Sequence, residues 1–196
     1  MRNVFVSILL LFFSQLSYSQ SKFGFKAGTS LYYLKTNNDK TKDYSNSMPG
    51  VSFGIFVQLP ANQHFTIQPE LTYSFQRTQE TYYGSKLKTG YFLVPILLKY
   101  NFAGTPANIY FGPQFGFLTN ARSSFNGVTS DITGNFSRTD FGITAGLGTS
   151  PSKGGVNFDV RVFHGLIDVI KSEFDGGLHT RNLLISATIG YAFKKK

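Results

Sequence analysis

Apolar and polar side chains alternate one by one through most of the chain after residue 20. In the clearest case, Phe65, Ile67, Leu71 and Phe75 fall on one face, and threonine, glutamine, glutamate and serine fall on the other. A period of two is that of a β-strand, because successive side chains point to opposite faces of a sheet. The pattern recurs in eight segments, which we predict to be strands: 22–34, 51–59, 64–76, 91–102, 108–119, 138–149, 155–165 and 181–193.

Strand length and connector length distinguish a soluble sheet from a membrane barrel. The segments have roughly 9–13 residues, close to the ~9–11 that cross a bilayer at a tilt. Long and short connectors also alternate strictly, as expected for outer loops and periplasmic turns. We therefore predict an all-β fold, an eight-stranded antiparallel up-and-down transmembrane β-barrel. The long connectors are 35–50, 77–90, 120–137 and 166–180, and the short ones are 60–63, 103–107 and 150–154.

Aromatic residues gather near the ends of the predicted strands, where membrane barrels carry interfacial girdles. A soluble core would concentrate its rings in the middle of its strands instead. We assign the following residues to girdles: Tyr33, Tyr73, Phe75, Tyr91, Phe92, Tyr100, Phe102, Tyr191 and Phe193.

The N-terminus has the pattern of a secretory signal. Arg2 precedes an apolar run at 4–13, and small residues follow at Ser17 and Ser19. Ten helical residues cover only ~15 Å, about half of a bilayer core, so a membrane anchor is not favoured. We expect a signal peptide at 1–19 and one barrel domain at 20–196. Without Arg2, 18 Lys and Arg face 10 Asp and Glu, a formal net charge of +8.

The polar face of the strands carries three basic and three acidic residues, and it should point into the barrel. An eight-stranded barrel has an interior that its own side chains fill, and buried charges must be paired. We expect an interior ion-pair plug, and hence no wide pore, made of Lys26, Glu70, Lys99, Asp140, Asp159 and Arg161.

Basic residues also outnumber acidic ones in the connectors. They form either a solvated loop surface or contacts to lipopolysaccharide phosphates in the outer leaflet. Nucleic acid is not expected as a partner, because these residues are scattered and the chain is exported. The candidate lipopolysaccharide contacts are Lys35, Arg77, Lys86, Lys88, Arg122, Arg138, Lys171 and Arg181.

Few residues suggest site chemistry. Without cysteine there is no disulfide, thiolate nucleophile or cysteine zinc site. The segment 50–54 matches the nucleophile-elbow string, but it lies in an alternating strand with no helix after it. We expect no catalytic residue, metal site or cofactor. One alternative remains a lipid A-modifying enzyme built on His164, Ser172 and Glu173, and another is a narrow diffusion channel for small solutes.

Four segments together resemble the PorT-like outer-membrane β-barrel domain, a family typical of Bacteroidota. The most specific part is the strand with Pro95, Lys99 and Tyr100, followed by Tyr110, Gly112 and Pro113; the four segments are 91–100, 109–113, 140–148 and 161–166. The resemblance implies an outer-membrane barrel, and one namesake member belongs to a secretion and gliding apparatus. We expect a monomer with a structural, surface-interaction or secretion-accessory role, whose partners are outer-membrane lipid, lipopolysaccharide and other envelope or secretion-apparatus proteins.

Overall fold

The computed structural model describes residues 21–36, 45–80, 85–151, 154–171 and 179–193. The expected signal peptide at 1–19 lies outside these residues. Among the described residues, no helix is long and apolar enough to cross a bilayer.

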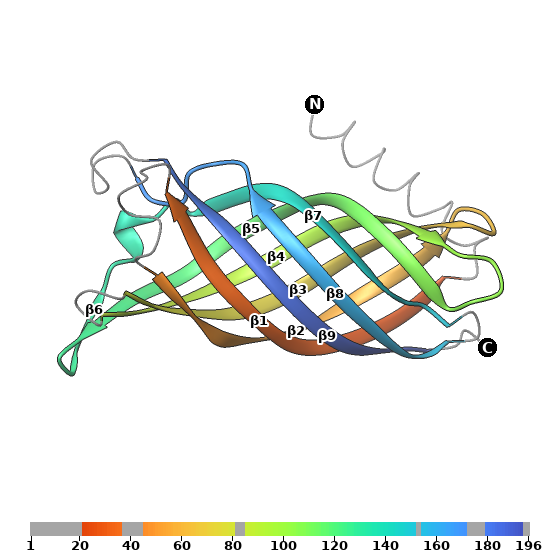
Figure 1. Ribbon diagram of the computed structural model, residues 1–196, viewed down its shortest axis with the longest axis horizontal. Helices are drawn as coiled ribbons and strands as arrows, with labels where there is room; N and C mark the ends of the chain where they lie inside the picture. The colour runs from red at the N-terminus through yellow and green to blue at the C-terminus, as the bar shows by residue number, and fades with distance from the viewer. Residues whose placement is uncertain (1–20, 37–44, 81–84, 152–153, 172–178, 194–196) are drawn as a thin grey trace, which may run out of the picture.

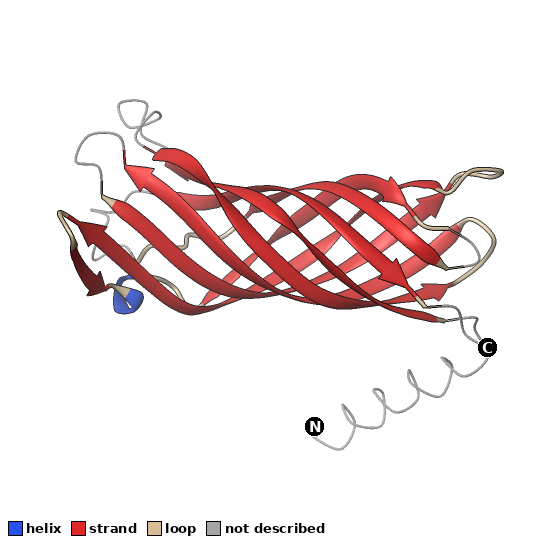
Figure 2. Cartoon of the chain, turned by 90° about the horizontal axis from the view of Figure 1, so that it is seen from below, coloured by secondary structure: helices blue, strands red, loops and turns tan. Residues whose placement is uncertain are grey.

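Eight long strands form a closed, tilted cylinder (Figures 1 and 2). Each strand pairs antiparallel with its neighbour, β4 pairs with β5, and β1 pairs with β9, so the sheet closes on itself. The predicted eight-stranded antiparallel barrel is therefore confirmed. Its strands are β1 (Lys22–Thr36), β2 (Ser45–Pro60), β3 (Phe65–Glu80), β4 (Lys86–Asn101), β5 (Ala107–Phe125), β7 (Thr139–Thr149), β8 (Gly155–Gly165) and β9 (Thr180–Ala192).

The apolar face of every long strand points outward and the polar face points inward, as the alternation requires. On β3 the outward row runs from Phe65 to Phe75, with polar Gln68 and Glu70 buried between its members. Ten residues of strand span ~33 Å, which a tilt near 40° reduces to about 25 Å, the height of the apolar band of an outer-membrane barrel.

The aromatic side chains near the strand ends lie mostly on the outer surface and contact one another. Tyr73 meets Phe92 with ring centroids 4.9 Å apart, and Phe25 meets Phe193 at 5.6 Å across the β1–β9 seam. Tyr91 is the exception, and its assignment to a girdle was wrong because its side chain is buried inside the barrel. It precedes outward-facing Phe92 on β4, and consecutive strand residues face opposite sides.

Several strands continue further at the outer end than the alternation predicted. Strand β5 continues to Phe125 and pairs with a short strand, β6 (Val128–Asp131), that follows the turn at Asn126 and Gly127. Both turn residues have positive φ, 48° and 81°, as a two-residue type I′ hairpin turn requires. Part of the expected loop 120–137 is therefore a β-hairpin that projects beyond the barrel (Figure 1). A single turn of 3-10 helix, η2 (Thr133–Asn135), follows it.

Candidate functional site

Five of the six predicted interior charges form one network in the barrel lumen. Arg161 binds Glu70 through two hydrogen bonds, Nη1 to Oε2 at 2.8 Å and Nη2 to Oε1 at 3.2 Å. Lys26 Nζ lies 2.5 Å from the same Oε2. Asp159 Oδ1 lies 3.6 Å from Arg161 Nη2 and 3.7 Å from Lys99 Nζ. The network therefore joins β1, β3, β4 and β8 across the lumen.

Neutral neighbours complete the network. Gln68 donates to Glu70 Oε1 at 2.6 Å. Lys99 Nζ lies 4.9 Å and Arg161 Cζ 5.5 Å from the centroid of the Tyr110 ring, within the range of cation–π attraction. Gly146 makes space for that ring, because a Cβ there would lie 2.7 Å from the phenol carbon and oxygen of Tyr110. Small residues on facing strands thus give the long charged side chains room to meet.

Asp140, the sixth predicted residue, is buried but lies apart from the network. Asn182 donates to Asp140 Oδ2 at 2.6 Å, and Tyr32 donates to Asn182 Oδ1 at 2.6 Å. Among the described residues no cation pairs with this carboxylate. The lumen therefore holds three basic and two acidic side chains in one layer. Asp140, nearer the outer end, is hydrogen-bonded to the uncharged Asn182 instead.

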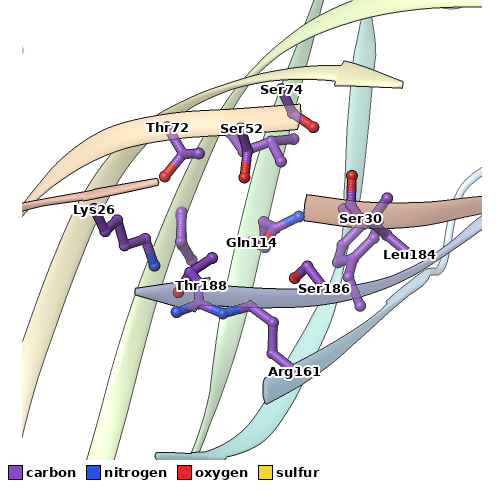
Figure 3. A pocket seen from close by; sticks show the side chains of 13 residues that line it. Lys26, Ser30, Ser52, Thr72, Ser74, Gln114, Arg161, Leu184, Ser186 and Thr188 are labelled. Carbon is purple, nitrogen blue, oxygen red and sulfur yellow. The ribbon is translucent and has the colours of Figure 1, made fainter. Parts of the chain in front are cut away.

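A small polar chamber lies beside the ion network (Figure 3). Its volume is about 30 Å³, which is room for about two water molecules. Hydroxyl and amide groups project into it between Lys26 and Arg161, as the close-up shows. The hydroxyl- and amide-bearing lining residues are Ser30, Ser52, Thr72, Ser74, Gln114, Ser186 and Thr188.

An apolar layer lies in the lumen on the outer side of this chamber. Its most buried rings belong to Tyr32, Tyr91 and Phe163, and Phe136 enters from the segment after η2. The remaining members are Leu93, Leu118, Ala121 and Leu184. The alternation gave no warning of this layer, because large apolar residues interrupt the polar face at other levels too, as Phe56 and Leu97 do.

Two connector segments fold over this layer and hold each other in place. Phe136 forms an isolated antiparallel bridge with Ile170, and Ser137 N donates to Val169 O at 2.9 Å. Val169 N in turn donates to Thr180 O at 2.9 Å. At the opposite end, beside the short turns, a wide hollow of about 830 Å³ opens between residues that include Gln58, Thr66 and Asn101.

The eight basic candidates at the rim divide into two groups. Lys171 Nζ donates to Gly134 O at 2.6 Å, and Arg181 Nε lies 3.7 Å from Asp168, which also contacts His179 at 2.7 Å. Lys35 lies opposite Arg181 on the neighbouring strand, and Arg138 is an exposed residue just before β7. The other group lies on the outward face of three adjacent strands, β3, β4 and β5, and consists of Arg77, Lys86, Lys88 and Arg122.

Of the three residues of the suggested enzyme site, the structure describes His164. His164 is exposed on β8, between Ile143 and Leu183 on the neighbouring strands. Its suggested partners Ser172 and Glu173 lie outside the described residues. Among the described residues, no group of three or more His, Asp or Glu side chains lies close enough to hold a metal ion.

Comparison with solved structures identifies small outer-membrane barrels of the same shape. Neisserial surface protein A (NspA) superposes with a TM-score of 0.58 at 14% identity, covering 87% of this chain and 97% of that chain. Ail, the attachment invasion locus protein of Yersinia pestis, gives 0.54 at 15% identity, with coverage of 89% and 99%. At these identities the likeness concerns the fold. The comparison with curated proteins gives no match.

The sequence itself matches a family model over most of its length. The model describes an outer membrane protein beta-barrel domain, and the match covers residues 13–171. It therefore includes β1 to β8 and the residues of the luminal network. Together with the closed barrel and its lipid-facing apolar band, this match shows that the chain is an outer-membrane protein that belongs to the outer membrane protein beta-barrel domain family.

Proposed function

We propose that this protein is a closed, non-conducting barrel that anchors an interaction surface at the outside of the cell. The observation that supports the proposal is that two layers of side chains lie one above the other in the lumen. A solute would have to pass both the layer of Lys26, Glu70 and Arg161 and the apolar layer around Tyr91 and Phe163. Breaking a buried ion pair leaves an uncompensated charge, at a cost of about 3–5 kcal/mol. This makes the narrow-channel alternative less favourable.

The proposed interaction surface is the β5–β6 hairpin, which extends past the end of the barrel (Figure 1). Its tip presents Phe125 and Val128 opposite each other, 47% and 70% exposed. On β5, Phe125 lies well beyond the outward-facing aromatic residue Phe117, because each strand residue adds ~3.3 Å. We therefore place these two apolar residues above the lipid. Exposed apolar side chains on a projecting element are typical of protein contact sites. Residues 37–44 and 172–178, parts of the predicted long connectors, lie outside the described residues.

The likeness to known proteins supports a surface role by analogy. The Yersinia pestis protein is named for attachment and invasion, and one of its structures contains a heparin analogue, sucrose octasulfate; that chain matches with a TM-score of 0.52 at 12% identity and coverage of 89% and 99%. We extend to this chain only the general idea of a barrel that presents loops to the outside. Catalysis is not part of the proposal, because His164 makes no side-chain hydrogen bond within the described residues.

Within its family, we place the chain among the PorT-like barrels. The sequence motif that supports this placement forms one packing unit in the structure. Pro95 and Lys99 on β4 face inward beside Tyr110 and Gly112 on β5, and Lys99 contacts the Tyr110 ring. A secretion-accessory role is therefore the second candidate, and it would use the periplasmic turns and the wide hollow beside them.

Planar-bilayer recording tests the closure. We expect the purified, folded protein to insert without large, stable single-channel currents. A matched Arg161→Ser variant removes the side chain that joins Glu70 to Asp159 and should raise the frequency of small openings. Large, stable conductance of the unaltered protein would overturn the proposal.

In-cell photo-crosslinking tests where the partner binds. A photoreactive residue is placed at Val128 in the outer hairpin or at Thr105 in a periplasmic turn, one position per strain. We expect protein adducts from position 128 and none above background from position 105. Adducts from position 105 alone would contradict the surface role and favour the secretion-accessory one.

A further inference from the structure

Three cations lie side by side across the outer end of the barrel wall. Arg77 on β3 is the register partner of Lys88 on β4, and Lys88 is the register partner of Arg122 on β5. All three side chains are exposed on the outward face, and Lys86 follows on the same face of β4. Directly paired residues in an antiparallel sheet have Cβ atoms ~5 Å apart. We call Arg77, Lys86, Lys88 and Arg122 the cationic row.

This arrangement is unfavourable without an anion, because like charges directly opposite each other destabilise a sheet. Within the described residues, none of the four side chains forms an ion pair. Among the side chains that the structure describes, the acid nearest in register is Asp131, opposite Arg122 at one end of the row, and Thr133 N already donates to its carboxylate at 2.9 Å. The cationic row therefore holds four positive charges with one acid at its edge.

The height of the row matches the phosphates of a lipid headgroup. Arg77 lies two residues beyond Phe75, the last apolar residue of its outward row, and the aromatic residues Tyr73, Phe92 and Phe117 lie one layer below. Aromatic girdles mark the boundary between hydrocarbon and headgroups. Two residues of tilted strand add ~5 Å along the membrane normal. The cations thus lie just above the hydrocarbon boundary.

The surface between these cations is hollowed. A groove of about 150 Å³ is lined by Arg77, Lys86 and Lys88, with Met48, the register partner of Arg77, beside them. Leu87 also borders the groove, but its side chain lies on the inner face of β4 and packs against the apolar layer of the lumen. A groove that places three cations beside an apolar methionine side chain suits a ligand that is anionic at one end and apolar at the other. Among the other rim cations, Lys171 and Arg181 are already bound within the protein.

We propose that the cationic row binds the phosphate groups of lipid A, the phosphorylated glycolipid of the outer leaflet. Arg and Lys side chains provide charge-assisted hydrogen bonds to phosphate oxygens, and the bound phosphates cancel the repulsion between strands. The barrel is then held by its neighbouring lipopolysaccharide molecules at the β3–β4–β5 side. This inference goes beyond the closed-barrel proposal and depends only on the outer-membrane location of the protein.

Lipid titration of the full mature barrel tests the site. The folded protein in an uncharged detergent is titrated with diphosphorylated lipid A or with chemically dephosphorylated lipid A, and binding is measured by native mass spectrometry. The row variant Arg77→Ser/Lys88→Ser/Arg122→Ser is compared with the rim control Lys35→Ser/Arg138→Ser/Lys171→Ser, which loses the same charge. We expect at least about a tenfold loss of lipid A affinity in the row variant and less than about threefold in the control.

A change of sign in thermal stability separates phosphate binding from a merely structural role. In lipid-free detergent the row variant should unfold at the same or a higher temperature than the unaltered protein, because repulsion is relieved. With diphosphorylated lipid A the order should reverse.

Three outcomes would overturn the proposal: equal affinity losses in the row variant and the control, equal binding of dephosphorylated lipid A, or row-dependent binding of heparin without row-dependent binding of lipid A. The last would assign the row to a soluble polyanion. None of these outcomes depends on bilayer conductance, so the two proposals fail separately.

Discussion

Positively charged side chains are paired with carboxylates in the lumen of this barrel, whereas at the outer rim they lie next to other positively charged side chains. Inside, Lys26, Lys99 and Arg161 each contact a carboxylate within 3.7 Å. At the rim, Arg77, Lys88 and Arg122 are successive register partners on three strands, and among the described side chains a single acid, Asp131, is paired with the last of them. A cation removed from water needs its counter-charge in the same molecule. A cation at a surface can obtain it from the surroundings, so the two regions report on different environments.

The largest expected effect comes from removing one acid of the luminal network. Glu70→Gln leaves Lys26 and Arg161 without their shared carboxylate, and we expect a loss of about 3–5 kcal/mol in the free energy of unfolding. The matched control is Asp140→Asn, an equally conservative change at a buried acid that has no cation partner, with an expected loss below about 1.5 kcal/mol. Urea unfolding followed by gel mobility of the folded barrel measures both, and equal losses would refute the contrast.

A second comparison concerns space rather than charge. A Cβ at Gly112 inside the barrel would lie 2.0 Å from Ile96 O, a backbone atom that cannot yield, whereas a Cβ at Gly134 in the rim segment would meet nothing within 4 Å. We expect Gly112→Ala to cost about 1–3 kcal/mol of stability, and Gly134→Ala to be neutral. The same urea assay applies. A neutral Gly112→Ala would mean that the β4–β5 wall is looser than its hydrogen-bond register implies.

The smallest expected effect is a titration at the rim. The Thr133 backbone and side chain hold the pKa of the exposed Asp131 carboxyl below its usual value of 3.8, with a minor contribution from Arg122. A depressed pKa in the folded state stabilises the hairpin above pH 3.8, and this contribution is lost as the pH falls further. NMR titration should show the Asp131 pKa below 3.8. It should rise slightly in Arg122→Ser and more in Thr133→Val, and the reverse order would contradict this account.

The alternation of side chains was sufficient to predict the barrel, because a period of two fixes which face of each strand is apolar. It placed Lys26 and Glu70 inside without any knowledge of register. It did not predict partners, since strand tilt and stagger decide which residues share a layer. Lys99, on the strand beside Glu70, contacts Asp159 instead, while Arg161 crosses the lumen from β8 to reach Glu70.

The outer end was less predictable for a different reason. Beyond the membrane the apolar face no longer has to meet lipid, so the alternation weakens while the backbone pairing continues. The Asn126–Gly127 turn was a readable signal for the β5–β6 hairpin. The irregularities in register near Met48 and Gly90 had no comparable signal. The grouping of four basic residues into one row also required the register of β3, β4 and β5.

The luminal network draws its members from residues 26 to 161, and this has a consequence for biogenesis. A sheet that lacks β8 leaves Glu70 with Lys26 as its cation partner, because Asp159 and Arg161 both lie on β8. Before the barrel closes, water can reach these charged side chains and keeps them hydrated. Pairing of β1 with β9 closes the cylinder and separates the interior from water, and a charge removed from water needs its counter-charge nearby. A chain that lacks β9 would leave β1 and β8 as unpaired strand edges, and its interior would stay hydrated. Such open edges promote aggregation.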